Sequence, residues 1–141
     1  MKGLIARQSI VIHASPALIW KALTDPAMIK EYLFGTQVSS DWKVGSPIRY
    51  RGVWQGRTYE DKGVVLGVVP EKVLETSYWS SMSGLPDKPE NYKMVMYELT
   101  PEQEGTRLTI TQDNNATEGE KDHSEQNWRV VLGILKGLLE K

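Results

Sequence analysis

The sequence TEGEKDHSEQNWRVVLGILKGLLE, at residues 117–140, contains the clearest secondary-structure signal in the chain. Its first four residues match a capping box, in which Thr117 caps the first turn of a helix and Glu120 reaches back. Apolar side chains then recur at steps of three and four, at Trp128, Val131, Leu132, Leu135, Leu138 and Leu139. This spacing predicts one amphipathic helix over residues 118–140, and its apolar stripe has to be buried against another layer of the fold.

The residues that could form this second layer lie upstream of the helix. Runs of β-branched and aromatic residues separated by turn residues predict six strands, at residues 37–43, 47–54, 57–69, 73–82, 92–100 and 106–113. Short connections such as Gln55-Gly56 favour antiparallel pairing. Residues 83–91 contain two prolines and a glycine, and we expect a surface loop there.

The N-terminal segment adds one more strand and two short helices. Residues 4–14 alternate around Ile10-Val11-Ile12, which predicts a strand. Ser15-Pro16 supplies an N-cap and a first-turn proline, and Asp25-Pro26 ends this helix and starts another that runs through Tyr32. The predicted order is one strand, two short helices, six strands and one long helix. It indicates an α+β fold in which a curved antiparallel sheet wraps around the C-terminal helix.

Composition is typical of an ordinary globular protein with a single domain, residues 1–141. The chain has a mass of 16.0 kDa, 40% hydrophobic and 25% charged residues, and a formal net charge of −1. This charge does not favour nucleic acid as a partner, and no apolar run is long enough to span a membrane. With no cysteine and only two histidines, we expect no metal and no cofactor. The cysteine-free sequence and the polar N-terminus indicate a cytoplasmic protein.

The segment IHASPALIWKALTDP, residues 12–26, closely resembles the opening signature of the START-like (SRPBCC, helix-grip) superfamily. It is most similar to the branch called activator-of-heat-shock-protein-ATPase-like. Further similarities follow in the family's order, at residues 41–45, 63–70, 74, 78–79 and 105–110 and at Trp128. The resemblance covers essentially the whole chain and implies a helix-grip fold with a cavity between the long helix and the sheet. It also implies binding of hydrophobic or amphipathic small molecules, and a few members act on chaperones or catalyse cyclisation.

Alternation along the strands predicts which side chains face such a cavity, with large apolar walls and a few polar groups that orient a ligand. The resemblance places the end of the second short helix and the loop 83–91 at the cavity mouth. The predicted cavity residues are Tyr32, Phe34, Tyr50, Trp54, Thr76, Tyr78, Met94, Met96, Trp128, Leu132 and Leu135. An ordinary packed core is the alternative interpretation of the same pattern. A β-bulge in this strand would shift its register, so that Trp79 would face the cavity in place of Tyr78.

Three further groups of residues each have two interpretations. Three arginines could clasp an anion or form a solvated sheet face: Arg49, Arg51 and Arg57. Four strand acids could include a general acid or base, with surface positions as the simpler interpretation: Glu60, Asp61, Glu75 and Glu98. Two glycines within one strand favour a bulge or bend over close approach to a ligand: Gly63 and Gly67.

These features lead to three hypotheses of function. The first is a binding module, linked to stress response, that encloses a hydrophobic or amphipathic ligand between the sheet and the C-terminal helix. The second is a chaperone-regulating interaction domain, which needs an exposed docking patch, and a weak homodimer is a related expectation. The third, a cyclase-like enzyme, is less favoured because we identify no catalytic residue. A closed apolar space above about 300 Å³ favours the first hypothesis, and a filled core with a large exposed patch favours the second.

Overall fold

The computed structural model describes residues 1–140 and has seven strands in one sheet. In chain order its elements are β1 (Leu4–Ile12), α1 (Pro16–Thr24), α2 (Pro26–Tyr32), β2 (Gln37–Ser39), β3 (Pro47–Trp54), β4 (Arg57–Val69), β5 (Val73–Tyr78), the short 3-10 helix η1 (Pro89–Asn91), β6 (Lys93–Glu102), β7 (Gly105–Asn115) and α3 (Glu118–Leu139). The predicted order of one strand, two short helices, six strands and one long helix is confirmed.

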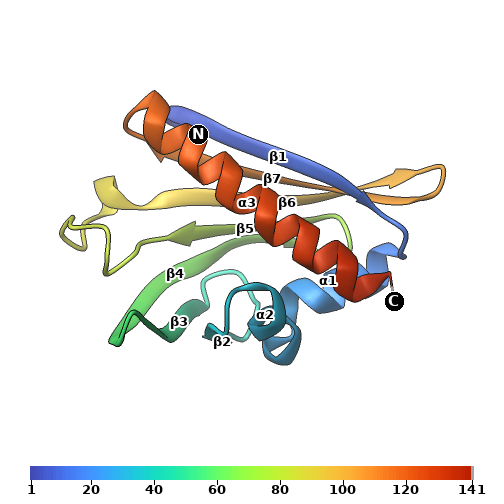
Figure 1. The fold of residues 1–141 in the computed structure, drawn as a ribbon, viewed down its shortest axis with the longest axis horizontal. Helices are drawn as coiled ribbons and strands as arrows, with labels where there is room; N and C mark the ends of the chain where they lie inside the picture. The colour runs from blue at the N-terminus through green and yellow to red at the C-terminus, as the bar shows by residue number, and fades with distance from the viewer. Residues whose placement is uncertain (141) are drawn as a thin grey trace.

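The sheet is antiparallel throughout, with the strand order β1-β7-β6-β5-β4-β3-β2. Strands β2 to β7 pair with their neighbours along the chain, as their short connections favour. The first strand, β1, pairs instead with the last strand, β7, and forms the edge of the sheet opposite β2. Figure 1 shows α3 crossing one face of the sheet diagonally, with α1 and α2 beside each other near β2. The α+β helix-grip architecture is confirmed.

Polar caps begin all three α-helices at the residues that the sequence predicts. The Ser15 hydroxyl accepts a hydrogen bond from an α1 amide at 3.2 Å, and the Asp25 carboxylate accepts one from an α2 amide at 3.0 Å. At α3, the Thr117 hydroxyl accepts from the Glu120 N–H at 3.1 Å. The Glu120 carboxylate in turn accepts from the Ala116 N–H at 3.3 Å, so the predicted capping box forms with its return bond one residue earlier.

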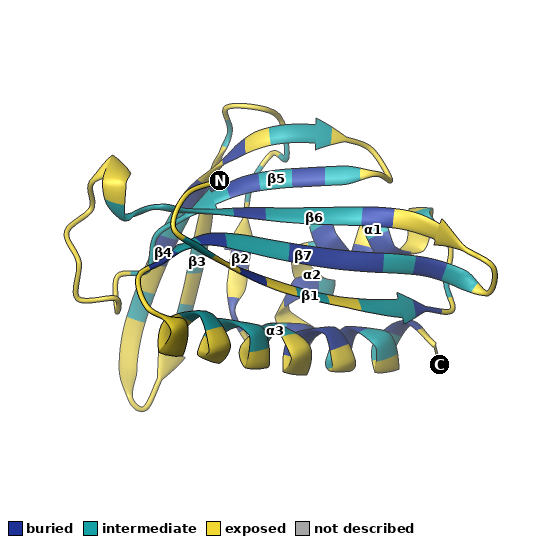
Figure 2. Cartoon of the chain, turned by 90° about the horizontal axis from the view of Figure 1, so that it is seen from above, coloured by how far each residue is buried: buried dark blue, intermediate teal, exposed yellow. Residues whose placement is uncertain are grey.

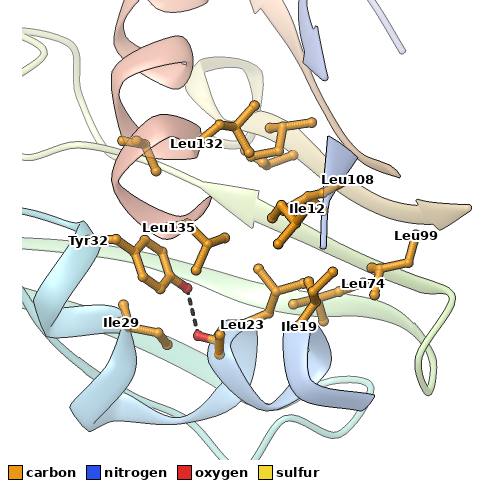
Figure 3. Packing of buried hydrophobic residues seen from close by; sticks show 14 of the residues in the cluster. Ile12, Ile19, Leu23, Ile29, Tyr32, Leu74, Leu99, Leu108, Leu132 and Leu135 are labelled. Carbon is orange, nitrogen blue, oxygen red and sulfur yellow. Dashed lines mark hydrogen bonds between the residues drawn. The ribbon is translucent and has the colours of Figure 1, made fainter. Parts of the chain in front are cut away.

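The core lies between α3 and the sheet. Figure 2 shows the buried side of α3 turned toward the strands and its exposed side turned away. Close packing joins α3 to the short helices: Figure 3 shows Leu135 of α3 beside Tyr32 of α2, and Ile19 of α1 belongs to the same buried cluster. The Tyr32 hydroxyl, although buried, donates to the Ala22 carbonyl oxygen at 2.8 Å, so this polar group is satisfied.

Two glycines in β4 allow the sheet to bend around α3. The β4–β5 register shifts between Val65 and Gly67, which is a bulge in the strand. At Gly63 the backbone of β5 approaches so closely that a Cβ atom would lie 1.8 Å from the Ser77 carbonyl oxygen. The close approach at Gly63 is therefore made by the neighbouring strand, and the bending interpretation is supported.

Several element boundaries differ from the predicted ones. The strand predicted at 37–43 ends at Ser39 because the chain then turns, with a φ of 57° at Trp42 and 90° at Gly45. The strand predicted at 73–82 ends at Tyr78, beyond which Trp79 forms only an isolated bridge.

No helix within residues 1–140 has both the length and the apolar character that crossing a membrane requires.

Candidate functional site

Two hollows lie between the sheet and the helices. The inner hollow has a volume of about 20 Å³, which is room for about one water molecule. The outer hollow is an open cleft of about 770 Å³ next to the first half of α3, and we call it the cleft. The cavity expected between the long helix and the sheet is therefore divided: the enclosed part is nearly filled, and the space above about 300 Å³ is an open cleft rather than the closed space named in the sequence criterion.

Aromatic side chains form most of the apolar wall of the cleft. Seven of them line it: Phe34, Tyr50, Trp54, Tyr59, Tyr78, Tyr97 and Trp128. Two lie at the opening, where Phe34 is 63% and Trp54 is 56% exposed. Val53 and Met82, also exposed, complete this apolar rim. Large apolar side chains that remain in contact with water around a hollow are typical of a binding surface.

Edge-to-face contacts hold the inner rings of the cleft. Tyr50 and Tyr78 meet with ring centroids 5.3 Å apart, and Tyr97 and Trp128 with centroids 6.1 Å apart. The Trp128 indole N–H also donates to the Gln112 side-chain oxygen at 2.8 Å. Strand and helix therefore fix these rings together before any ligand binds.

The wall of the cleft contains a buried carboxylate, that of Asp61 on β4, which is only 6% exposed. It accepts hydrogen bonds from the Tyr78 hydroxyl at 2.6 Å and from the Ser81 N–H at 2.9 Å and hydroxyl at 3.2 Å. Beside it, Tyr59 and Thr36 share a hydroxyl–hydroxyl bond of 2.6 Å. Gly52 leaves room for the Tyr59 ring, since a Cβ atom there would lie 2.4 Å from the Tyr59 hydroxyl.

A compact charged pair next to the start of α3 also lines the cleft. The Lys93 ammonium lies 2.6 Å from a Glu120 carboxylate oxygen and donates to the Asn114 carbonyl oxygen at 2.9 Å. The hydrogen bond from Lys93 lowers the pKa of Glu120. His123 and Asn127, both exposed, continue this polar rim along the helix.

Nine of the eleven predicted cavity residues line one of the two hollows. Five line the cleft: Phe34, Tyr50, Trp54, Tyr78 and Trp128. Four line only the inner hollow, where they form packed core: Tyr32, Thr76, Leu132 and Leu135. Tyr78 faces inward, so no bulge exchanges it for Trp79, which instead stacks on Tyr92 with centroids 6.5 Å apart.

The two predicted methionines need correction, because Met94 and Met96 line neither the inner hollow nor the cleft. Successive residues of a strand point to opposite faces, and in β6 it is Val95 and Tyr97 that face the helix. Both sets are apolar, so alternation alone could not decide between them.

Two cleft residues are missing from the predicted cavity set: Tyr59, which the sequence interpretation did not name, and Asp61, for which a surface position was the simpler interpretation. They share a face of β4 with Val65, which is fully buried, and this alternation was the available signal. The neighbouring acid, Glu60, lies on the other face, 3.1 Å from Arg49 and 3.5 Å from Arg51. Glu60 and these two arginines therefore lie on a solvated face of the sheet, as the simpler interpretation predicted, whereas Asp61 does not.

Alkaline titration should reveal the burial of the tyrosines. Burial raises the pKa of Tyr32, Tyr50, Tyr78 and Tyr97, and burial with a hydrogen bond to Asp87 raises that of Tyr92 to about 12. The pKa values of these tyrosines in the folded protein exceed the value of about 10 in the unfolded chain. The stability that the neutral tyrosines contribute is therefore fully present below pH 10 and is lost as the pH rises above it. We expect fewer than half of the six tyrosines to ionise, by absorbance at 295 nm, before circular dichroism reports unfolding. Ionisation of all six near pH 10 in a folded protein would contradict this packing.

Comparison with known proteins agrees with the resemblance of residues 12–26. Residues 13–140 match the family model described as Activator of Hsp90 ATPase homolog 1-like protein. A protein from Cytophaga hutchinsonii, whose structure was determined in solution, is 48% identical over 99% of this chain and 97% of its own, with a TM-score of 0.87. None of the curated proteins compared matches the sequence.

Two other solved structures, each 23% identical, share the fold. One is a crystal structure of a protein from Mesorhizobium loti, with 97% of each chain covered and a TM-score of 0.79. The other is the solution structure of the Aha1 dimer from Colwellia psychrerythraea, with 97% of this chain and 96% of that chain covered and a TM-score of 0.73. Because the family model matches nearly the whole chain, and the fold agrees, this protein belongs to the Activator of Hsp90 ATPase homolog 1-like family, a branch of the START-like superfamily.

Proposed function

We propose that this protein binds a hydrophobic or amphipathic small molecule in the cleft between the sheet and the first half of α3. The observation that carries the proposal is the cleft of about 770 Å³ with seven aromatic side chains in its wall. Its volume falls within the range of about 300–1,000 Å³ that small-molecule sites occupy, and its mixture of apolar walls and a few polar groups is typical of them.

The backbone at the cleft opening supports this proposal. Phe34 has a φ of 56°, a left-handed conformation that costs a non-glycine residue about 1 kcal/mol or more. The same residue exposes 63% of its surface at the rim of the cleft. A strained backbone that holds an aromatic ring in water is explained if the ring contacts a ligand.

A bulky side chain inside the cleft should block binding. Ser124 lines the cleft from α3, and Ser124→Phe adds a phenyl ring to the space that a ligand would occupy. We expect the Kd of the neutral fluorescent probe N-phenyl-1-naphthylamine to rise at least about 10-fold, or 1.4 kcal/mol. Fluorescence titration of the folded variants measures this change.

Gln126→Phe is the matched control, because Gln126 is exposed on the same helix and does not line the cleft. It should bind the probe like the original protein. Equal affinities in the two variants, or probe binding only during partial unfolding, would contradict the proposal.

Regulation of a chaperone is the second candidate function, and the exposed apolar rim favours it. Phe34, Val53, Trp54 and Met82 together offer a surface that a protein partner, or a second copy of this chain, could cover. A purified Hsp90-type chaperone should then bind the original protein and the Ser124→Phe variant equally, and bind Trp54→Ala at least about 10-fold more weakly by calorimetry. A link to stress response and a cytoplasmic location are part of the first proposal, the binding of a small molecule.

A further inference from the structure

Asp61 is a buried acid with no positive partner. Its residue is 6% exposed, yet within residues 1–140 no lysine, arginine or histidine nitrogen lies within 4.0 Å of its carboxylate. Burying a carboxylate is costly unless hydrogen bonds and an opposite charge compensate for the lost water. The fold supplies hydrogen bonds to Asp61 but supplies no cation.

The hydrogen bonds to Asp61 leave one of its acceptor positions unfilled. One carboxylate oxygen accepts two bonds, both from Ser81, and the other accepts only one, from the Tyr78 hydroxyl. A carboxylate has about four acceptor positions, so one remains on the oxygen that faces Tyr78. All three donors are uncharged groups, and Asp61 belongs to the wall of the cleft.

The surroundings of Asp61 suit an organic cation. Tyr50, Tyr59 and Tyr78 line the same part of the wall, and Trp54 lies at the opening. The faces of such rings attract ammonium groups, most strongly where water is excluded. A bound metal ion fits less well, because no group of three His, Asp or Glu side chains suited to a metal occurs in the described part of the chain.

The other charges in the cleft cancel one another. Lys93 pairs with Glu120 at 2.6 Å and also donates to a backbone carbonyl, so it offers no free positive charge to an anionic ligand. His123, the other titratable side chain that α3 contributes to the cleft wall, is exposed at the rim. Asp61 is therefore the uncompensated charge of the cleft.

We infer that the ligand carries a positively charged nitrogen, which binds against the Asp61 carboxylate among the tyrosine rings while the apolar body of the ligand occupies the rest of the cleft. This inference rests on the proposed function and specifies the ligand class: amphipathic amines or quaternary ammonium compounds. An ammonium N–H would donate to the open Asp61 oxygen, and a quaternary group would contact the rings and the carboxylate.

Three probes with one fluorophore test the charge. Dansylcadaverine ends in an ammonium, N-acetyl-dansylcadaverine in a neutral amide, and 6-(dansylamino)hexanoate in a carboxylate. At pH 7 we expect the ammonium probe to bind about 10-fold more tightly than the neutral one, and the carboxylate probe to bind most weakly. Binding of the ammonium probe, but not of the neutral one, should shift the NMR signal of the Ser81 amide, whose N–H bonds to Asp61.

Two variants assign the preference to Asp61. Asp61→Asn removes the charge and keeps the shape of the side chain, so the ammonium advantage should fall below about 2-fold. Glu60→Gln removes the same charge from the outer face of β4 and should leave the advantage unchanged. If Asp61→Asn does not fold, the Ser81 signal in the original protein still reports where the ammonium group binds.

The outcomes separate the two proposals. Neutral and ammonium probes that bind equally, and that Ser124→Phe weakens equally, would overturn the cationic ligand and leave the small-molecule site in place. An ammonium advantage that survives in Asp61→Asn would overturn the role of Asp61. Absence of binding by all three probes and by N-phenyl-1-naphthylamine would overturn the proposed function, and the inference with it.

Discussion

Replacing Gly63 with alanine should destabilise the protein by at least about 3 kcal/mol, because the new methyl group has no space. A Cβ atom at this position would lie 1.8 Å from the carbonyl oxygen and 2.7 Å from the carbonyl carbon of Ser77. Both are backbone atoms of β5, so the strain cannot be relieved by a rotamer change. Urea denaturation followed by circular dichroism measures the loss.

Gly67→Ala is the matched control on the same strand. The nearest atoms to a Cβ there belong to the Glu75 side chain, at 3.5 and 3.6 Å, which is ordinary contact. We expect a change within about 1 kcal/mol, and alanine in a strand interior can even stabilise by reducing the entropy of the unfolded chain. Equal losses for Gly63→Ala and Gly67→Ala would mean that β4 and β5 do not approach as described.

Replacing Leu135 with alanine should cost about 2–5 kcal/mol, because this side chain is 1% exposed at the centre of the α3 stripe. It lines the inner hollow together with Leu132, Tyr32 and Leu74. The substitution removes apolar contacts and enlarges a space that otherwise holds about one water molecule. The free energy of unfolding in urea gives the magnitude.

Val130→Ala serves as the control for this substitution. Val130 lies on the same helix but is 53% exposed, so its loss should change stability by less than about 0.5 kcal/mol. A similarly small effect for Leu135→Ala would show that the helix packs on the sheet in another register.

The two largest effects differ in how much of them the sequence could predict. The steps of three and four in residues 118–140 are sufficient to predict that Leu135 is buried, because a helix places those positions on one side. The destabilisation expected for Gly63→Ala, in contrast, depends on the backbone of Ser77, which lies on the next strand. A glycine in a strand predicts an irregularity, but not which backbone atom approaches it.

The candidate site shows the same division. Inward positions of β3 and β5, such as Tyr50 and Tyr78, follow from alternation next to clearly apolar neighbours. Alternation in β6 was uninformative, since Met94 and Met96 are as apolar as Val95 and Tyr97. The burial of Asp61 was missed because a strand acid is ordinarily exposed, and only its partners on β5 and the following loop make burial tolerable.

Local patterns in the chain are sufficient to predict the order of elements, the caps of the helices and the buried stripe of α3, because these depend on residues a few positions apart. Tertiary structure alone decided that β1 pairs with β7, that β6 turns Val95 and Tyr97 inward, and that the expected cavity is a filled interior beside an open cleft. Those features depend on the register between strands and on side-chain volumes from distant segments. A shift of one residue in a strand reverses every side chain, so local patterns leave such choices open until the whole sheet has paired.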